Sequence, residues 1–297
     1  MLHTDFSVTT GELPGGDRPS EDRIFQAPGV VIVLDGVSTV SDDEPRGGWY
    51  AHTLGDHLTA GLAAAPNADL RHLLEQAISA IVREYGLVAG SSPAATVSIV
   101  RRRGEEIDAL VLADSPVFAR TNGGGFDQVR DNRLAQLVAG RPEYAEYQSW
   151  LRAGRGFKAP EHRALLQKLR THQLRHLNND APGGYWVAEA VPEAARHAVV
   201  RTWPTADIAE ILVMTDGVSA AVEEYGLYPS WGHLARVCRT DGPDQAVRAI
   251  HDLETEEDPD GRRWPRYKVS DDKALAHLQF PHAAPHDTST QGFGEVY

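Results

Sequence analysis

Aspartate residues follow three short apolar segments of this 297-residue sequence. The three positions are Asp35, Asp114 and Asp216, and a glycine follows the first and the last of them. Short β-branched runs bounded by turn residues predict buried strands. A charge is rarely left beside a core unless it is paired or binds a cation, and Mg²⁺ and Mn²⁺ prefer oxygen ligands. These carboxylates therefore predict a site for hard divalent cations.

Two acidic pairs, Glu21-Asp22 and Asp271-Asp272, extend this series toward the two ends of the chain. The first pair precedes the predicted strand that ends at Asp35, and the second precedes the last predicted strand. We favour Asp271 over Asp272 as the functional carboxylate, and the sequence leaves both registers open.

The elements that must position these residues are mostly strands in hairpins. Strand patterns run through residues 94–129, resume at 184–187, 197–202 and 211–217, and end in the segment 269–280. Apolar residues at helical spacing predict helices at 49–66, 68–85, 218–225, 230–239 and 243–254. Because the helices are segregated from the hairpins, we expect an α+β layered domain rather than alternating βαβ units.

We expect one domain over residues 1–280, followed by an irregular tail at 281–297. A polar segment with helical periodicity, residues 131–180, interrupts the strand series. It is rich in arginine and lysine, although the whole chain carries a formal net charge of −13. A basic insert beside an acidic metal site could attract phosphorylated substrates, or it could be an ordinary solvated insert with i,i+4 charge pairs.

Composition narrows the class of protein further. A net charge of −13 argues against a nucleic-acid partner, which would usually meet a basic face. The lone cysteine, Cys238, rules out an internal disulfide framework or a cysteine-rich zinc site. No segment resembles a signal peptide or a spanning helix, so we expect a cytoplasmic protein without a membrane partner.

Each Asp-Gly by itself could be a simple turn after a strand, but the acidic motifs occur in a specific order. Glu21-Asp22, Asp35-Gly36, Asp114-Ser115, Asp216-Gly217 and Asp271-Asp272 together resemble the metal-dependent phosphatases of the protein phosphatase 2C family. The resemblance covers about residues 20–280, and the chain looks like a divergent bacterial-type member. It implies a four-layer α-β-β-α sandwich of two antiparallel sheets flanked by helices, with a helical flap.

The resemblance also implies roles for these residues in holding two Mn²⁺ or Mg²⁺ ions and a possible third. Asp35 would bridge both ions, the Gly36 carbonyl would bind the first, and Asp216 and Asp271 would bind the second. Glu21 and Asp22 would hold metal-bound waters. Asp114, together with Asp216, would serve the third ion. Asp35, Asp216 and Asp271 are therefore the expected catalytic carboxylates.

The chain departs from the family pattern at the arginine that binds the substrate phosphate. Asp17 stands at that position, so Arg18 is our candidate for the contact and Arg23 is the second choice. The expected activity is hydrolysis of phosphate monoesters by a metal-bridging water, with phosphoserine or phosphothreonine proteins as substrates. The alternatives are a small-molecule phosphate ester as substrate, or a phosphatase-like domain that binds a partner.

Overall fold

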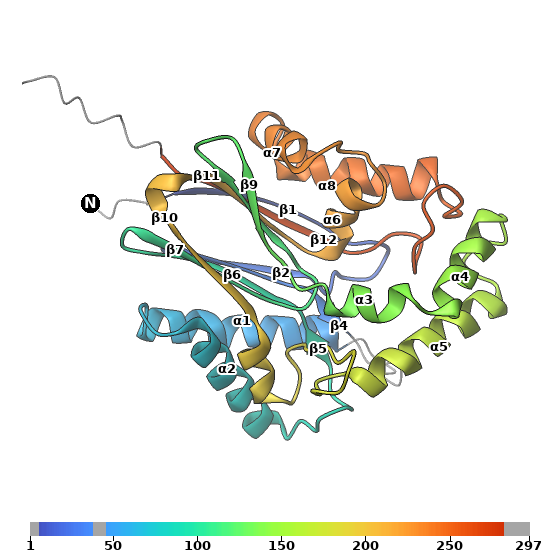
Figure 1. Cartoon of the computed structure of the whole chain (residues 1–297), viewed down its shortest axis with the longest axis horizontal. Coiled ribbons are helices and arrows are strands. Elements are labelled where there is room, and N and C mark those ends of the chain that lie inside the picture. The colour runs from blue at the N-terminus through green and yellow to red at the C-terminus, as the bar shows by residue number, and fades with distance from the viewer. Residues whose placement is uncertain (1–5, 38–45, 282–297) are drawn as a thin grey trace, which may run out of the picture.

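The computed structural model describes residues 6–37 and 46–281, and two five-stranded antiparallel sheets form its centre (Figure 1). The first sheet has the order β1-β12-β11-β8-β9, and the second has the order β10-β7-β6-β3-β2. The strands of the first sheet are Ser7–Leu13 (β1), Lys273–Gln279 (β12), Ile208–Met214 (β11), Val117–Thr121 (β8) and Phe126–Val129 (β9). Those of the second are Val199–Pro204 (β10), Glu106–Leu112 (β7), Val97–Arg103 (β6), Val30–Leu34 (β3) and Arg23–Ala27 (β2).

Strand β3 shows why the central strands read as continuous apolar runs. Val31 and Val33 point into the core between the two sheets, whereas Ile32 and Leu34 face the helices on the other side. Successive side chains of a strand point to opposite faces, and here both faces are covered. Every residue of β3 is therefore buried.

Helices cover the outer face of each sheet, which completes four layers (Figure 1). Helices α1 (Gly47–Ala64) and α2 (Leu70–Tyr85) share an apolar cluster with the second sheet. Helices α6 (Asp216–Glu223), α7 (Trp231–Thr240) and α8 (Pro243–Asp252) pack in the same way on the first sheet. The predicted α-β-β-α sandwich is confirmed.

The segment that interrupts the strand series contains three helices at one end of the sandwich (Figure 1). We call them the flap helices: α3 (Arg133–Ala139), α4 (Pro142–Arg152) and α5 (Pro160–His176). Proline at the first position starts both α4 and α5, where its missing N–H costs nothing. Tyr147, Leu151, Leu165 and Leu169 form a small separate core between α4 and α5.

The structure differs from the predicted elements at residues 184–187 and in two strands near the N-terminus. Residues 184–187 do not form a strand; their only pairing among the described residues is an isolated bridge between Tyr185 and Leu177. Strands β1 and β2 were not predicted: both lie at sheet edges, and the β1 sequence SVTTGEL is mostly polar. The expected irregular tail lies outside the described residues apart from its first position. No helix in the described part of the chain is long and apolar enough to cross a membrane.

Candidate active site

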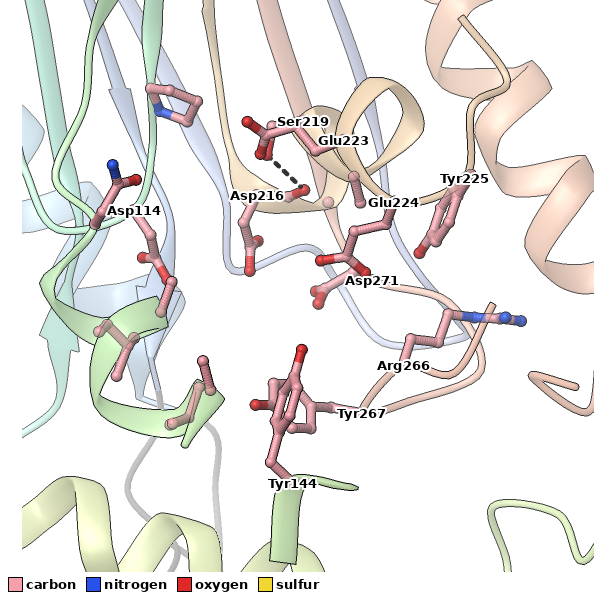
Figure 2. Close-up of a pocket in the computed structure, with 18 of the residues that line it drawn as sticks. Asp114, Tyr144, Asp216, Ser219, Glu223, Glu224, Tyr225, Arg266, Tyr267 and Asp271 are labelled. Carbon is pink, nitrogen blue, oxygen red and sulfur yellow. Dashed lines mark hydrogen bonds between the residues drawn. The ribbon is translucent and has the colours of Figure 1, made fainter. Parts of the chain in front are cut away.

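Six of the seven predicted metal-binding residues line one cavity of about 740 Å³ at the end of the sandwich. We call it the acidic cavity. It lies where β3, β7 and β11 end and where the flap helices approach, and its predicted ligands are Glu21, Asp35, Gly36, Asp114, Asp216 and Asp271. A smaller cavity of about 310 Å³ adjoins it and shares Asp114, Asp216 and Asp271. In Figure 2 these three carboxylates lie across an open space from Tyr144 and Tyr267.

Asp35 is the central carboxylate of this site. The backbone N–H of Asp35 donates to the Thr96 hydroxyl at 3.1 Å, and the Thr96 N–H donates to the Asp35 carbonyl at 2.9 Å, which fixes its backbone. Within residues 6–37 and 46–281, its carboxylate has no hydrogen bond or ion pair. Desolvation raises the pKa of Asp35 well above its usual range, and the surrounding carboxylates raise it further.

Asp216 and Asp22 lie next to Asp35, and their pKa values are raised as well. Desolvation and the neighbouring Asp271 carboxylate raise the pKa of Asp216 well above the usual range. Asp22 is almost fully buried and accepts a 2.8 Å hydrogen bond from the Thr215 hydroxyl. That bond favours the charged form, but desolvation outweighs it and raises the pKa of Asp22 to about 7.

Gly36 is required by close packing rather than by a turn. A Cβ on Gly36 would lie 2.5 Å from the Gly47 carbonyl carbon and 2.7 Å from the Glu21 carbonyl oxygen. A Cβ on Gly47 would in turn lie 2.8 Å from a Glu21 carboxylate oxygen. The two glycines therefore allow the start of α1 to approach the strand end and bring Glu21 against it.

Asp114 follows a residue in a strained conformation. Ala113 has φ of +68°, a left-handed conformation that costs a non-glycine residue about 1 kcal/mol. Its N–H donates to Asp131 Oδ2 at 3.3 Å. Desolvation raises the pKa of Asp114 to about 6, with Asp131 and Asp271 as further causes. Strain at a residue that presents a carboxylate to the cavity is typical of functional sites.

The structure separates the two candidates in the last acidic pair. Asp272 turns away from the acidic cavity, and its two carboxylate oxygens accept the N–H groups of Gly15 and Glu21, each at 2.8 Å. Asp271 lines the acidic cavity, and its Oδ1 accepts the Lys268 ammonium at 2.5 Å. Asp272 thus holds the N-terminal loop in place, while Asp271 faces the other carboxylates.

The donor set fits hard cations. Buried like-charged carboxylates repel one another unless a cation lies between them, and an all-oxygen set suits Mg²⁺ and Mn²⁺. The side chains surround a shared space rather than touching: among the described residues, no three acidic, histidine or cysteine side chains converge closely enough to form a finished coordination shell. The resulting site is acidic and open to the cavity.

A family model for protein phosphatase 2C matches residues 16–253, which is most of the chain. The chain belongs to the protein phosphatase 2C family. That match includes every predicted site residue except Asp271. No curated protein matches the sequence.

Solved structures of bacterial proteins share the fold of this chain. A PPM Ser-Thr phosphatase from Mycobacterium smegmatis, in complex with cacodylate, is 20% identical, with a TM-score of 0.53 over 93% of this chain and 98% of that one. PppA of Pseudomonas aeruginosa, described as a key regulatory component of T6SS, is 16% identical, with a TM-score of 0.53 over 93% and 97%. A bacterial serine phosphatase is 13% identical, with a TM-score of 0.59 over 94% and 99%.

The basic residues around this protein phosphatase 2C site are not all where the sequence placed them. Arg18 is exposed and lines a neighbouring cavity of about 590 Å³ rather than the acidic cavity. The guanidinium of Arg23 already donates to two backbone carbonyls, that of Ser20 at 2.5 Å and that of Asp22 at 2.6 Å. The cations that line the acidic cavity are Arg170 of α5, which lies in the basic insert that the sequence analysis expected beside the site, and Lys268, which it did not name.

Lys268 stands three residues before Asp271, and that spacing was the one available signal for it. The signal was weak because residues 258–272 form no helix or strand. Arg170 belongs to the basic insert that the sequence analysis expected beside the metal site, but which of its basic residues reaches the cavity depends on how the flap helices dock beside the sheets. Tyr144 of α4 was missed for the same reason, and Tyr267 was missed because it lies in the irregular loop 258–272.

Proposed function

We propose that this chain is a metal-dependent phosphomonoesterase. The observation that carries the proposal is the acidic cavity itself: Asp35 and Asp216 have raised pKa values because they are desolvated beside other carboxylates. Such an arrangement is unfavourable by itself and becomes favourable when divalent cations bind. Membership of the protein phosphatase 2C family supports phosphate esters as the substrates of such a site.

The proposed roles follow the family pattern residue by residue. Asp35 and the Gly36 carbonyl would hold one Mn²⁺ or Mg²⁺, and Asp35, Asp216 and Asp271 would hold a second. Asp114 would serve a third ion together with Asp216. When bound, such ions lower the pKa of a water and stabilise the charge that develops at phosphorus.

The remaining residues would orient solvent around that centre. Glu21 accepts the Gly48 N–H at 3.3 Å, at the first turn of α1, which fixes the position of its carboxylate beside Gly36. The hydroxyl of Thr215 orients Asp22 at 2.8 Å from the opposite side. These two side chains are thus held in place by α1 and by the end of β11, and in the proposal they accept hydrogen bonds from metal-bound waters.

Phosphoserine and phosphothreonine proteins are the substrates we favour, and the flap helices support this choice. Arg170 of α5 reaches the acidic cavity, and within the described residues its guanidinium has no ion pair. A second basic surface lies on the flap, where Arg141, Lys168 and Arg175 line a shallow groove. A flap of this kind could bind the segment around a phosphorylated residue, whereas a small phosphate ester would need only the acidic cavity.

The activity is tested with p-nitrophenyl phosphate after removal of metal by EDTA. We expect no hydrolysis without metal and recovery on addition of Mn²⁺ or Mg²⁺. Activity that persists in EDTA would contradict the proposal, and absence of hydrolysis with any divalent cation would favour a phosphatase-like binding domain.

The substrate class needs a second comparison. Replacement of residues 131–180 by a short Gly/Ser linker should leave p-nitrophenyl phosphate hydrolysis largely intact and reduce hydrolysis of phosphoserine peptides. If the full and shortened proteins hydrolyse each of the two substrates at the same rate, the flap is not a specificity element.

A further inference from the structure

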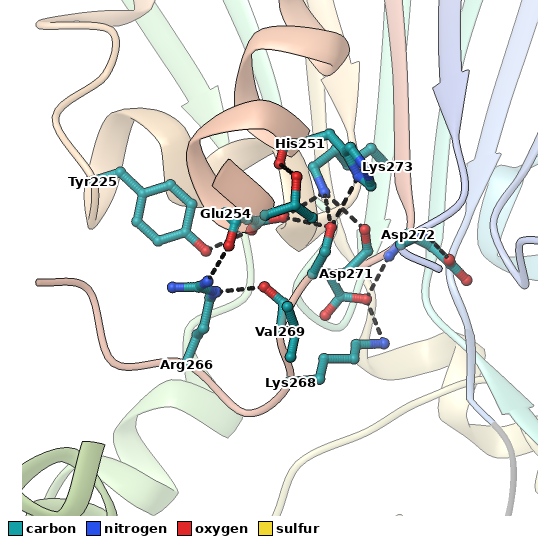
Figure 3. A network of polar contacts seen from close by, with 12 residues as sticks. Tyr225, His251, Glu254, Arg266, Lys268, Val269, Asp271, Asp272 and Lys273 are labelled. Carbon is teal, nitrogen blue, oxygen red and sulfur yellow. Dashed lines mark hydrogen bonds and ion pairs between the residues drawn. The ribbon is translucent and has the colours of Figure 1, made fainter. Parts of the chain in front are cut away.

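Lys268 lies where three cavities around the site meet. It lines the acidic cavity, the smaller cavity beside Tyr144 and the cavity that contains Arg18. Its ammonium forms an ion pair with Asp271 Oδ1 at 2.5 Å (Figure 3). The side chain is nevertheless 58% exposed, so it can move without unpacking the core.

The backbone on both sides of Lys268 is held firmly. The Val269 carbonyl accepts a 2.8 Å hydrogen bond from Arg266, whose guanidinium also donates to the Glu254 carbonyl at 2.7 Å (Figure 3). The Asp271 carbonyl accepts the buried Lys273 ammonium at 2.8 Å. The loop is therefore fixed, and the flexible part of this region is the lysine side chain itself.

Most other arginine side chains near these cavities already have partners within the protein. Arg130 pairs with Glu223, Arg266 pairs with Asp258, and Arg23 donates to backbone carbonyls. Lys268 differs because its partner is a carboxylate that the proposed function assigns to a metal ion. A divalent cation on Asp271 would weaken that ion pair by taking its oxygen and by repelling the ammonium.

We propose that Lys268 exchanges partners: it pairs with Asp271 in the metal-free protein and with the substrate phosphate once Asp271 holds a cation. This inference rests on the proposed function. The phosphate dianion would then lie between the ions and an ammonium on a flexible four-carbon stem. Lys268 would supply the positive contact that Asp17 does not supply at the position of the family's arginine.

The exchange predicts effects of opposite sign for one substitution. Without Lys268, a cation has no competitor for Asp271, so metal binding should become tighter. Phosphate loses a charged hydrogen bond, so its binding should become weaker. An ordinary surface ion pair would produce neither pattern, because its loss changes little beyond stability.

The test uses the full chain and the variants K268Q, K268R and K158Q. Lys158 is exposed and lines none of the three cavities, so K158Q controls for the loss of one positive charge. Titration calorimetry gives the affinity for Mn²⁺ and then the affinity of the Mn²⁺-loaded protein for inorganic phosphate. We expect K268Q to bind Mn²⁺ about threefold more tightly and phosphate about tenfold more weakly, with K268R close to wild type for phosphate.

Equal affinities of K268Q and K158Q for both ligands would overturn the inference. Tighter Mn²⁺ binding with unchanged phosphate binding would overturn the exchange, because Lys268 would then be only a competitor. Both readouts are binding constants and need no turnover. A wild-type protein that fails to hydrolyse esters would therefore refute the proposed function without deciding the role of Lys268.

Discussion

The chain buries charged side chains on both sides of the loop 258–272, and the two groups differ in their partners. On the α8 side, a buried group has two acids and two bases, which we call the paired cluster: Glu254, Lys273, Asp258 and Arg266. Figure 3 shows Glu254, Lys273 and Arg266. Lys273 donates to Glu254 at 2.6 Å and to the Ser270 hydroxyl at 3.0 Å. On the other side, the acidic cavity gathers carboxylates, and among the described residues that of Asp35 at its centre has no such partner.

The difference shows which buried charges serve the fold and which serve a ligand. In the paired cluster, each charge is neutralised inside the protein, and Asp258 also accepts the N–H groups of Arg262, Arg263 and Trp264. A satisfied network of this kind holds an irregular loop in one conformation. Among the described residues, only Lys268 and Arg170 bring positive charge to the carboxylates of the acidic cavity, so we expect the free energy of this site to depend on an external cation.

The largest effect should come from Asp35→Asn, which removes a charge from the acidic cavity. Loss of several kcal/mol of electrostatic stabilisation in the transition state should reduce Mn²⁺-dependent kcat by about a thousandfold. The metal-free variant should unfold at a higher temperature than wild type, because one member of a like-charged group is gone. Kinetics and thermal unfolding in EDTA measure the two effects. A variant that keeps full activity would contradict the assignment of Asp35.

Lys273→Met should destabilise the protein, in contrast to Asp35→Asn, because it breaks the paired cluster. Removal of one partner leaves Glu254 buried and unpaired, which should lower the free energy of unfolding by roughly 3 kcal/mol with or without metal. The double variant K273M/E254Q should recover part of this loss, since no unpaired charge remains. Chemical denaturation measures all three proteins. An unchanged stability of K273M would show that the pair contributes nothing to the fold.

Asp271 and Asp272 provide the same comparison between two adjacent residues. Asp272→Ala removes the acceptor for the Gly15 and Glu21 N–H groups and should cost about 2 kcal/mol of stability. Asp271→Asn should weaken Mn²⁺ binding while stability in EDTA changes little. Denaturation and Mn²⁺ titration of both variants separate the two roles. Loss of stability in Asp271→Asn together with loss of Mn²⁺ affinity in Asp272→Ala would show that the two roles are assigned the wrong way round.

The pH dependence of stability should distinguish the acidic cavity from ordinary paired carboxylates. The pKa values of Asp22, about 7, and Asp114, about 6, are above the usual value, so the folded protein binds more protons than the unfolded chain between about pH 4 and 7. The metal-free protein should therefore lose stability as pH rises through this range. Stabilisation by Mn²⁺ should increase over the same range, because the metal needs ionised carboxylates.

Thermal unfolding in EDTA and in Mn²⁺ at about pH 5 and pH 7.5 measures this dependence. Asp22→Asn is the control, because it should flatten the decrease in the metal-free protein. The account would be contradicted if Asp22→Asn and the wild-type protein showed the same slope.

The unbroken apolar runs predicted buried strands such as β3 and an α+β layered domain, because both faces of these strands are covered, and the four-layer sandwich was predicted from the family resemblance. The sequence also predicted which acidic residues would gather, because strand ends deliver Asp35 and Asp216 to one edge. It could not separate Asp271 from Asp272, since that choice depends on which carboxylate faces the Gly15 N–H, 257 residues away in the chain. Edge strand β1 and the irregular loop that carries Lys268 have no periodic pattern to read.

Mn²⁺ titration of EDTA-treated protein, followed by calorimetry at neutral pH, tests the central claim most directly. The claim is that the carboxylates of the acidic cavity form a metal site. It predicts saturable binding of about two ions per wild-type chain and an affinity at least about tenfold weaker in Asp35→Asn. Absence of Mn²⁺ binding by the wild-type protein, or equal affinity in Asp35→Asn, would contradict it.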